Sequence, residues 1–138
     1  MPAIDECQPQ IIRALQKDGW AVEPKPFRVK SRHRTIHIDI EASRQANGSQ
    51  QHIMLVEVKC FPDNRSATPE IYTAIGQYLV YRSMLTTFNL DIPLYLAVPK
   101  LLYLATFDRV IQLTLKESKI NMLVVDLDNE VIDQWIMW

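Results

Sequence analysis

The order of helical and extended patterns predicts one α/β domain with a central mixed β-sheet flanked by helices. Three apolar runs show no alternation, as expected for strands buried on both faces: Ile53–Val56, Leu94–Val98 and Met122–Val125. Segments with helical spacing lie between these runs, which is typical of sheet and helix layers. A single domain over residues 1–138 is long enough to bury about two-thirds of its unfolded surface. We expect the element order α-β-β-β-α-β-α-β-β.

The N-terminal elements are a helix followed by strands. A helix ending at Gly19 is predicted by apolar residues three and four positions apart, namely Ile4, Cys7, Ile11 and Leu15. This helix either begins near Pro9 or is bent there. A first strand follows over residues 20–29, where Pro24 and Pro26 confine it to an edge or a bulge. Strict alternation over Thr35–Glu41 then predicts a half-buried strand with its isoleucines facing inward.

The C-terminal half alternates helices and strands. A helix is predicted from Thr68 to about Leu85 and another from about Leu101 to Lys119, on either side of the Leu94–Val98 strand. The Met122–Val125 run is the next strand. The turn at Asp128-Asn129 leads into a last strand over Val131–Ile136.

The pairing of the two strands around Asn47-Gly48 brings two acids together. Folding a hairpin about Gly48 pairs residues whose numbers sum to 96, so that Asp39 stands opposite Glu57 with Cβ atoms about 5 Å apart. Lys59, two residues beyond Glu57, lies on the same face. A register slip of one residue would place the two carboxylates on opposite faces.

Two carboxylates at such a distance repel unless one is protonated or a cation lies between them. Mg²⁺ suits this pair because it binds through one or two carboxylates and keeps waters for a substrate phosphate. The alternative is an exposed hairpin end carrying a simple Glu–Lys pair. On the helix predicted from Thr68, Gln77 and Tyr81 are four residues apart, so that they either reach a ligand together or cap the rim of the core.

The charge balance argues against strong nonspecific nucleic-acid binding, since the formal net charge is −1. Any phosphate contact must come from a local patch. Five cations fall within ten residues and form the densest positive cluster: Lys25, Arg28, Lys30, Arg32 and Arg34. This cluster is either a phosphate-contacting patch or a solvated hairpin tip.

The only two cysteines, Cys7 and Cys60, have no spacing typical of a metal site. We expect them to be two buried small apolar side chains rather than a redox pair, in a reducing, cytoplasmic environment with no structural zinc. The sequence has no signal-peptide pattern and no apolar run near the roughly 20 residues that a membrane helix requires. No membrane association is therefore expected.

An acid on one strand, an E-x-K tripeptide ending the next and a helix carrying Gln resemble the PD-(D/E)XK nuclease superfamily, with its α-β-β-β-α-β core. Over essentially its whole length the chain looks like the XisH family, the cyanobacterial factors named for controlling excision of the fdxN DNA element. The similar stretches are Lys17-Asp18-Gly19-Trp20, Ile38-Asp39, Val56-Glu57-Val58-Lys59, Ala74-Ile75-Gly76-Gln77-Tyr78, Tyr95-Leu96-Ala97-Val98-Pro99 and Val131-Ile132-Asp133-Gln134-Trp135-Ile136.

The resemblance implies a role for each site residue. Asp39, Glu57 and the Val58 carbonyl would hold Mg²⁺ or Mn²⁺, which lowers the pKa of a bound water. Lys59 would position that water or stabilise charge on the scissile phosphate, and Gln77 would orient substrate or a metal-bound water. The sequence departs from the superfamily at Ile38, where the name has proline. On the first helix only Asp5 and Glu6 are available as an acidic partner.

Two functions follow from this resemblance. One is a metal-dependent DNA endonuclease-like enzyme that assists excision of a DNA element, with Asp39, Glu57, Lys59 and Gln77 as its site. The other is a catalytically silent excision factor that acts by binding DNA or a small partner protein of the same system. A two-fold homodimer is expected only because such dimers are common.

Overall fold

The structure, a computed structural model, describes residues 6–48, 50–61 and 67–138 as a mixed α/β fold. Four helices and eight strands are formed in this part of the chain, in the order α1 (Gln8–Lys17), β1 (Ala21–Val22), β2 (Phe27–Lys30), β3 (Thr35–Ile38), β4 (Ile40–Gln45), β5 (Gln51–Val58), α2 (Ala67–Thr87), β6 (Leu94–Pro99), α3 (Lys100–Thr106), α4 (Arg109–Glu117), β7 (Asn121–Asp126) and β8 (Val131–Ile136).

Six of these strands form one mixed sheet in the order β1-β4-β5-β6-β7-β8. The central strands β5, β6 and β7 run parallel to one another, while β1, β4 and β8 pair antiparallel with their neighbours. Strands β2 and β3 form a separate two-stranded hairpin. The prediction of a mixed sheet flanked by helices is confirmed.

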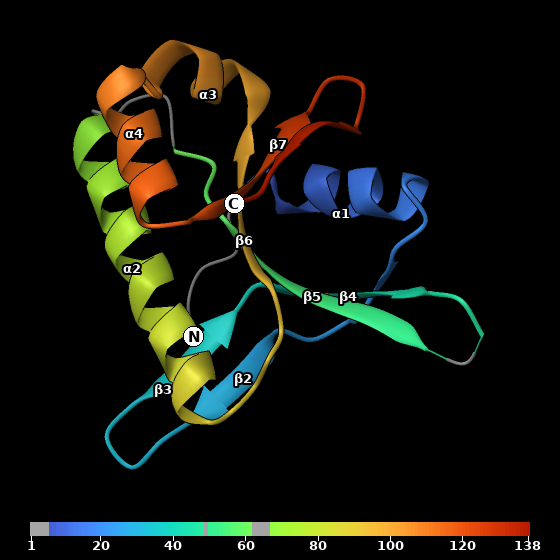
Figure 1. Cartoon of the computed structure of the whole chain (residues 1–138). Helices are drawn as coiled ribbons and strands as arrows, with labels where there is room; N and C mark the ends of the chain where they lie inside the picture. The colour runs from blue at the N-terminus through green and yellow to red at the C-terminus, as the bar shows by residue number, and fades with distance from the viewer. Residues whose placement is uncertain (1–5, 49, 62–66) are drawn as a thin grey trace.

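Helices cover both faces of the sheet, as Figure 1 shows. On one face, α2 and α4 pack on alternate side chains of the central strands, including Leu55, Leu96 and Met122, together with the apolar side of the β2–β3 hairpin. On the other face, α1 packs on the intervening side chains, among them Val56 and Leu123. Glu57 therefore faces the α2 side of the sheet, whereas its neighbours Val56 and Val58 pack on the α1 side, because successive strand residues point to opposite faces.

The strand predicted over Thr35–Glu41 is divided at Asp39. Ile38 ends β3, which pairs with β2, and Ile40 begins β4, which pairs with β5 in the main sheet. The predicted register is confirmed, since Ile40 pairs with Val56 and each following pair to Gln45–Gln51 also sums to 96. The observed order therefore contains two more strands than predicted, because the chain changes sheets at Asp39 and because residues 20–29 form β1 and β2 separately.

The helix predicted from Leu101 to Lys119 is also divided. Helix α3 ends before Phe107, and Asp108 begins α4 by accepting a hydrogen bond from the Ile111 N–H at 3.0 Å. Aspartate is a favoured N-cap residue, so this break has a recognisable local signal. Phe107 is buried between the helices and the sheet.

The expectation that Cys7 and Cys60 are separate apolar side chains is wrong. Their sulfur atoms form a disulfide, with Cα atoms 5.7 Å apart, which lies in the usual range for this bond. The two residues are 53 positions apart in sequence. The packing of the start of α1 against the end of β5 brings them together, and no local spacing could have revealed this contact.

Within the described ranges, no helix is both long and apolar enough to cross a membrane.

Candidate functional site

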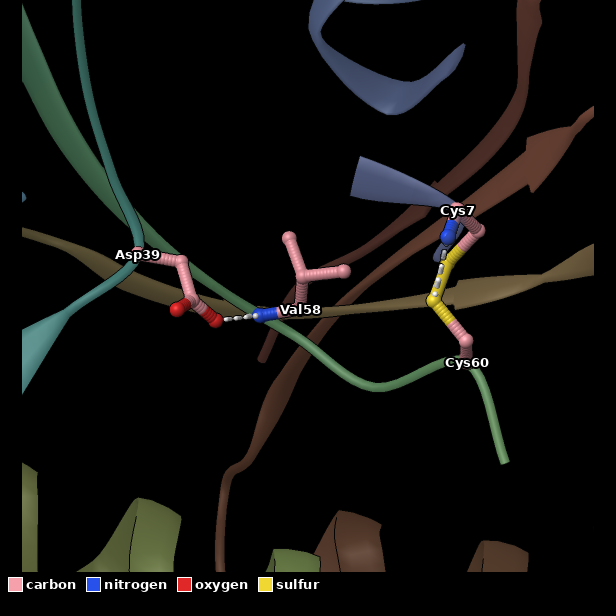
Figure 2. The surroundings of a disulfide bond; sticks show 4 residues. All are labelled: Cys7, Asp39, Val58 and Cys60. Carbon is pink, nitrogen blue, oxygen red and sulfur yellow. Dashed lines mark hydrogen bonds between the residues drawn. A yellow bond between two sulfur atoms is a disulfide. The ribbon is translucent and has the colours of Figure 1, made fainter. Parts of the chain in front are cut away.

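Asp39 and Glu57 meet where β4 begins and the antiparallel strand β5 ends. Asp39 lies at the change of sheets just before β4, and Glu57 is the second-last residue of β5. The backbone N–H of Asp39 donates to Glu57 Oε1 at 3.3 Å, and Asp39 Oδ2 accepts from the Val58 N–H at 2.8 Å. Figure 2 shows the second of these bonds. The two acids are thus neighbours, as the register of the hairpin predicts.

Glu57 is the one charged residue buried in the described part of the chain, with 4% of its surface exposed. Burial raises the pKa of the Glu57 carboxyl to about 8, and the negative charge of Asp39 adds to this rise. The positive charge of Lys59 acts in the opposite direction. At neutral pH, Glu57 therefore favours the protonated form, which relieves repulsion between the acids.

Lys59 lies beside the buried acid. Its Nζ is 3.7 Å from Glu57 Oε2, and its side chain is about a quarter exposed. The backbone N–H of Lys59 donates to the carbonyl of Ala97 in β6 at 3.0 Å, which continues the pairing of β5 by one residue. Lys59 can therefore present a positive charge at the rim of the site while Glu57 remains beneath it.

Gln77 and Tyr81 of α2 face the same region. Gln77 Nε2 donates to the Tyr81 hydroxyl at 2.6 Å. Burial raises the pKa of the Tyr81 hydroxyl, and the charges of Glu57 and Asp39 raise it further, as expected for a phenol close to both carboxyl groups. Gln77 Oε1 is buried and has no hydrogen-bond partner among the described residues. This amide oxygen is an available acceptor on the same helix as Tyr81, whose hydroxyl is close to both acids.

The predicted metal ligands are brought together only in part. The contact of Val58 with Asp39 is made by its N–H, a donor that sequence reasoning missed because it depends on the break at Asp39. Over the described ranges, no group of three or more His, Cys, Asp or Glu side chains gathers as a metal site. Glu6 is exposed, and Asp5 lies outside the described residues. Two hard carboxylate ligands remain, and these suit a magnesium-like ion that keeps several waters.

Four residues of the predicted basic cluster lie on the β2–β3 hairpin and its tip, and Lys25 lies just before β2. Arg28 pairs with His37 and Lys30 with Thr35, while Val29 and Ile36 point into the core. Arg28, Lys30, Arg32 and Arg34 are all exposed. Because Ile38 ends β3 immediately before Asp39, the hairpin leads directly into the carboxylate pair.

These features define a mixed α/β protein in which a buried glutamate, a neighbouring aspartate and a lysine meet at the end of a central strand. The chain belongs to the XisH family, since the family model described as "XisH protein" matches residues 1–133.

Two solved structures share the fold along nearly the whole chain. A fdxN element excision controlling factor protein from Anabaena variabilis is 36% identical, with a TM-score of 0.81, and the alignment covers 93% of this chain and 95% of that one. An XisH family protein from Nostoc punctiforme PCC 73102 is 33% identical, with a TM-score of 0.83 and coverage of 96% and 99%. A search of curated proteins finds no match.

Proposed function

We propose that this protein assists excision of a DNA element and carries a magnesium-dependent, endonuclease-like site for phosphodiester hydrolysis. A role in DNA excision is supported by the name of the Anabaena neighbour, a fdxN element excision controlling factor. Phosphodiester hydrolysis is supported by the PD-(D/E)XK resemblance and by the acids at the end of β5.

The observation that carries the proposal is the contact between the buried Glu57 and the partly buried Asp39. Burial and the neighbouring charge raise the pKa of Glu57 to about 8, so a second negative charge at this place is costly without a cation. A divalent ion would favour the ionised form of both acids. When bound, such an ion supplies a water of lowered pKa and neutralises charge on phosphate.

The neighbouring residues have roles that follow from their positions. Lys59 Nζ, 3.7 Å from Glu57 Oε2, can stabilise negative charge that develops on a phosphate oxygen. The unsatisfied Gln77 Oε1 can accept a hydrogen bond from a water or from substrate. The exposed cations of the β2–β3 hairpin can contact the DNA backbone next to the site. These cations are Arg28, Lys30, Arg32 and Arg34.

A catalytically silent excision factor is the second candidate. The hydrogen bonds from the Asp39 and Val58 N–H groups already satisfy part of both carboxyl groups, and a protonated Glu57 removes the repulsion without a metal. In this case the protein acts by binding DNA or a small partner protein, and the carboxylate pair has only a structural role.

Calorimetric titration with Mg²⁺ and Mn²⁺, followed by a nicking assay on supercoiled DNA, separates these candidates. The endonuclease-like proposal expects the parent protein to bind the ion and nick DNA, and Asp39→Asn to lose both activities. Asparagine retains an oxygen that can accept from the Val58 N–H, so the variant tests charge with little change in shape.

The matched control is Glu23→Gln, which removes an exposed acid on the loop after β1. This variant should bind the ion and nick DNA as the parent does. A parent protein that binds no divalent ion at millimolar concentration and nicks no DNA would leave the catalytically silent factor as the function.

A further inference from the structure

Cys7 and Cys60 lie at the end of β5, on the face of the sheet opposite Glu57 and Lys59. Cys60 follows Lys59, but it packs on the α1 side of the sheet, whereas Glu57 and Lys59 lie on the α2 side. Cys7 is the N-cap residue of α1. Figure 2 shows the disulfide that joins these residues and its position along the chain from Val58. The bond therefore links the start of α1 to the segment that carries the acids.

We propose that Cys7 and Cys60 form a reversible thiol–disulfide site whose redox state controls the order of the end of β5. Its reaction partners are a low-molecular-weight disulfide as oxidant and thiols as reductant. The proposal does not depend on phosphodiester hydrolysis, because a thiol count and the exchange of backbone amides can test it directly.

The two cysteines differ in ways that assign their roles. Cys7 is buried with 4% of its surface exposed, whereas Cys60 is only partly buried. The backbone N–H of Cys7, at the N-terminus of α1, donates to Cys60 Sγ at 2.9 Å. A helix N-terminus stabilises negative charge on sulfur. Cys60 is thus the sulfur that exchanges with an external thiol or disulfide, and Cys7 is the resolving partner.

The exchange balances with a simple disulfide, RSSR. The Cys60 thiolate attacks one sulfur of RSSR, which forms a mixed disulfide and releases the first RSH after protonation. The Cys7 thiolate then attacks Cys60 Sγ, which closes the protein disulfide and releases the second RSH. The two protein thiols lose two electrons and two protons, and RSSR gains both. Excess RSH reverses the same steps.

A strained residue next to Cys60 couples the bond to local order. Phe61 is buried and has a φ of 54°, in the left-handed region that a bulky residue rarely adopts. Such a conformation persists only when its surroundings impose it. The disulfide on Cys60 is one such constraint, so reduction should let the segment from Val58 to Phe61 open more often.

Titration in buffers of reduced and oxidised glutathione tests the redox site. After acid quenching and denaturation, labelling with a maleimide-coupled polyethylene glycol counts free thiols. We expect one transition from no label to two labels as the buffer becomes more reducing. A protein that keeps two thiols in excess oxidised glutathione, or keeps the disulfide in excess dithiothreitol, would overturn the proposal.

Single variants test the assigned roles. Cys7→Ser should form a mixed disulfide with glutathione at Cys60 when it is treated with the oxidised form, and mass spectrometry detects this adduct. Cys60→Ser, which retains the buried Cys7, should react much more slowly. Equal or faster reaction at Cys7 would contradict the assignment of Cys60 as the exchanging sulfur.

Hydrogen exchange of oxidised and reduced parent protein tests the coupling. The Val58 and Lys59 amides should exchange on the order of tenfold faster after reduction, whereas the buried strand β6 should change less. The double variant Cys7→Ser/Cys60→Ser is the control and should not respond to reductant. Equal exchange at Val58 and Lys59 in both redox states would exclude control of local order by the disulfide.

Discussion

Asp39 and Glu57 are joined by the Asp39 N–H, which donates to Glu57 Oε1 at 3.3 Å, while Asp39 Oδ2 accepts from the next residue of β5, Val58, at 2.8 Å. The backbone of each strand thus holds the carboxyl group of the other. This arrangement keeps the buried acid Glu57 in contact with the partly buried Asp39.

Replacing Glu57 by glutamine should change how stability depends on pH. The folded protein raises the pKa of Glu57 from its usual 4.5 to about 8, so between these values the native state binds more protons than the unfolded state. The extra stability that the protonated Glu57 gives the folded protein is complete below pH 4.5 and is lost as pH rises towards 8. Glu57→Gln resembles the protonated acid, so in metal-free buffer it should exceed the parent in stability by a few kcal/mol at pH 8 to 9.

Urea unfolding from pH 5 to 9, with a chelator present, measures this effect. The control is Glu41→Gln, which replaces an acid on the neighbouring strand β4. Its stability should depend on pH as that of the parent does. A Glu57→Gln variant with the parent's pH dependence would show that Glu57 is ionised throughout this range.

Lys59→Ala should raise the pKa of Glu57 further, because the positive charge of Lys59 lowers it in the parent. Carbon-13 NMR titration of the glutamate carboxyl groups measures the shift. Lys59→Arg keeps the charge and should retain a titration closer to that of the parent. In the nicking assay, Lys59→Ala should lose cleavage while retaining metal binding, since a protonated lysine is not a metal ligand. If Lys59→Ala instead lost metal binding, Lys59 would be required to keep the two acids in position for the ion.

The pairing of Asp39 with Glu57 was accessible from the sequence because hairpin register follows from the turn at Gly48 and from the two-residue period of strands. The division of Thr35–Glu41 was not accessible. Alternation is continuous through Asp39, and only tertiary packing decides that β3 pairs with β2 while β4 pairs with β5. The break is nevertheless what brings the Val58 N–H to Asp39.

The disulfide was inaccessible for a different reason. Cys7 and Cys60 belong to elements that meet only in the folded chain, and a separation of 53 residues carries no local pattern. The end of α3, by contrast, had a usable signal in Asp108, whose side chain caps α4. Continuous helical spacing across residues 101–119 hid that signal.

Tyr81→Phe should destabilise the protein by about 1 kcal/mol, because the Gln77 amide loses its hydroxyl acceptor at 2.6 Å in a partly buried position. Urea unfolding measures this change. Tyr72→Phe is the matched control, since Tyr72 lies on the same helix and is 62% exposed. If Gln77 and Tyr81 contact substrate together, Tyr81→Phe should also weaken DNA binding at the carboxylate pair, whereas Tyr72→Phe should not.

The β2–β3 hairpin provides a test of DNA contact that is independent of catalysis. Replacing Arg28, Lys30, Arg32 and Arg34 by alanine should weaken DNA binding at low salt and flatten its salt dependence. Each lost phosphate contact should reduce the slope of log K against log salt by about 0.9 on duplex DNA. All four side chains are exposed while Val29 and Ile36 anchor the hairpin, so unfolding free energy should change by less than about 1 kcal/mol.

Fluorescence anisotropy with a labelled duplex at several salt concentrations measures the slope, and urea unfolding checks the fold. The pair Arg28→Ala/Lys30→Ala should produce part of the effect. The control pair Arg109→Ala/Lys116→Ala removes two exposed cations from α4 and should leave the slope nearly unchanged. Equal losses from the two pairs would mean that DNA responds to net charge alone, and an unchanged slope in the quadruple variant would place any DNA contact outside the hairpin. A selective loss would instead mean that the hairpin contacts phosphate, because only local cations release counterions at the point of contact.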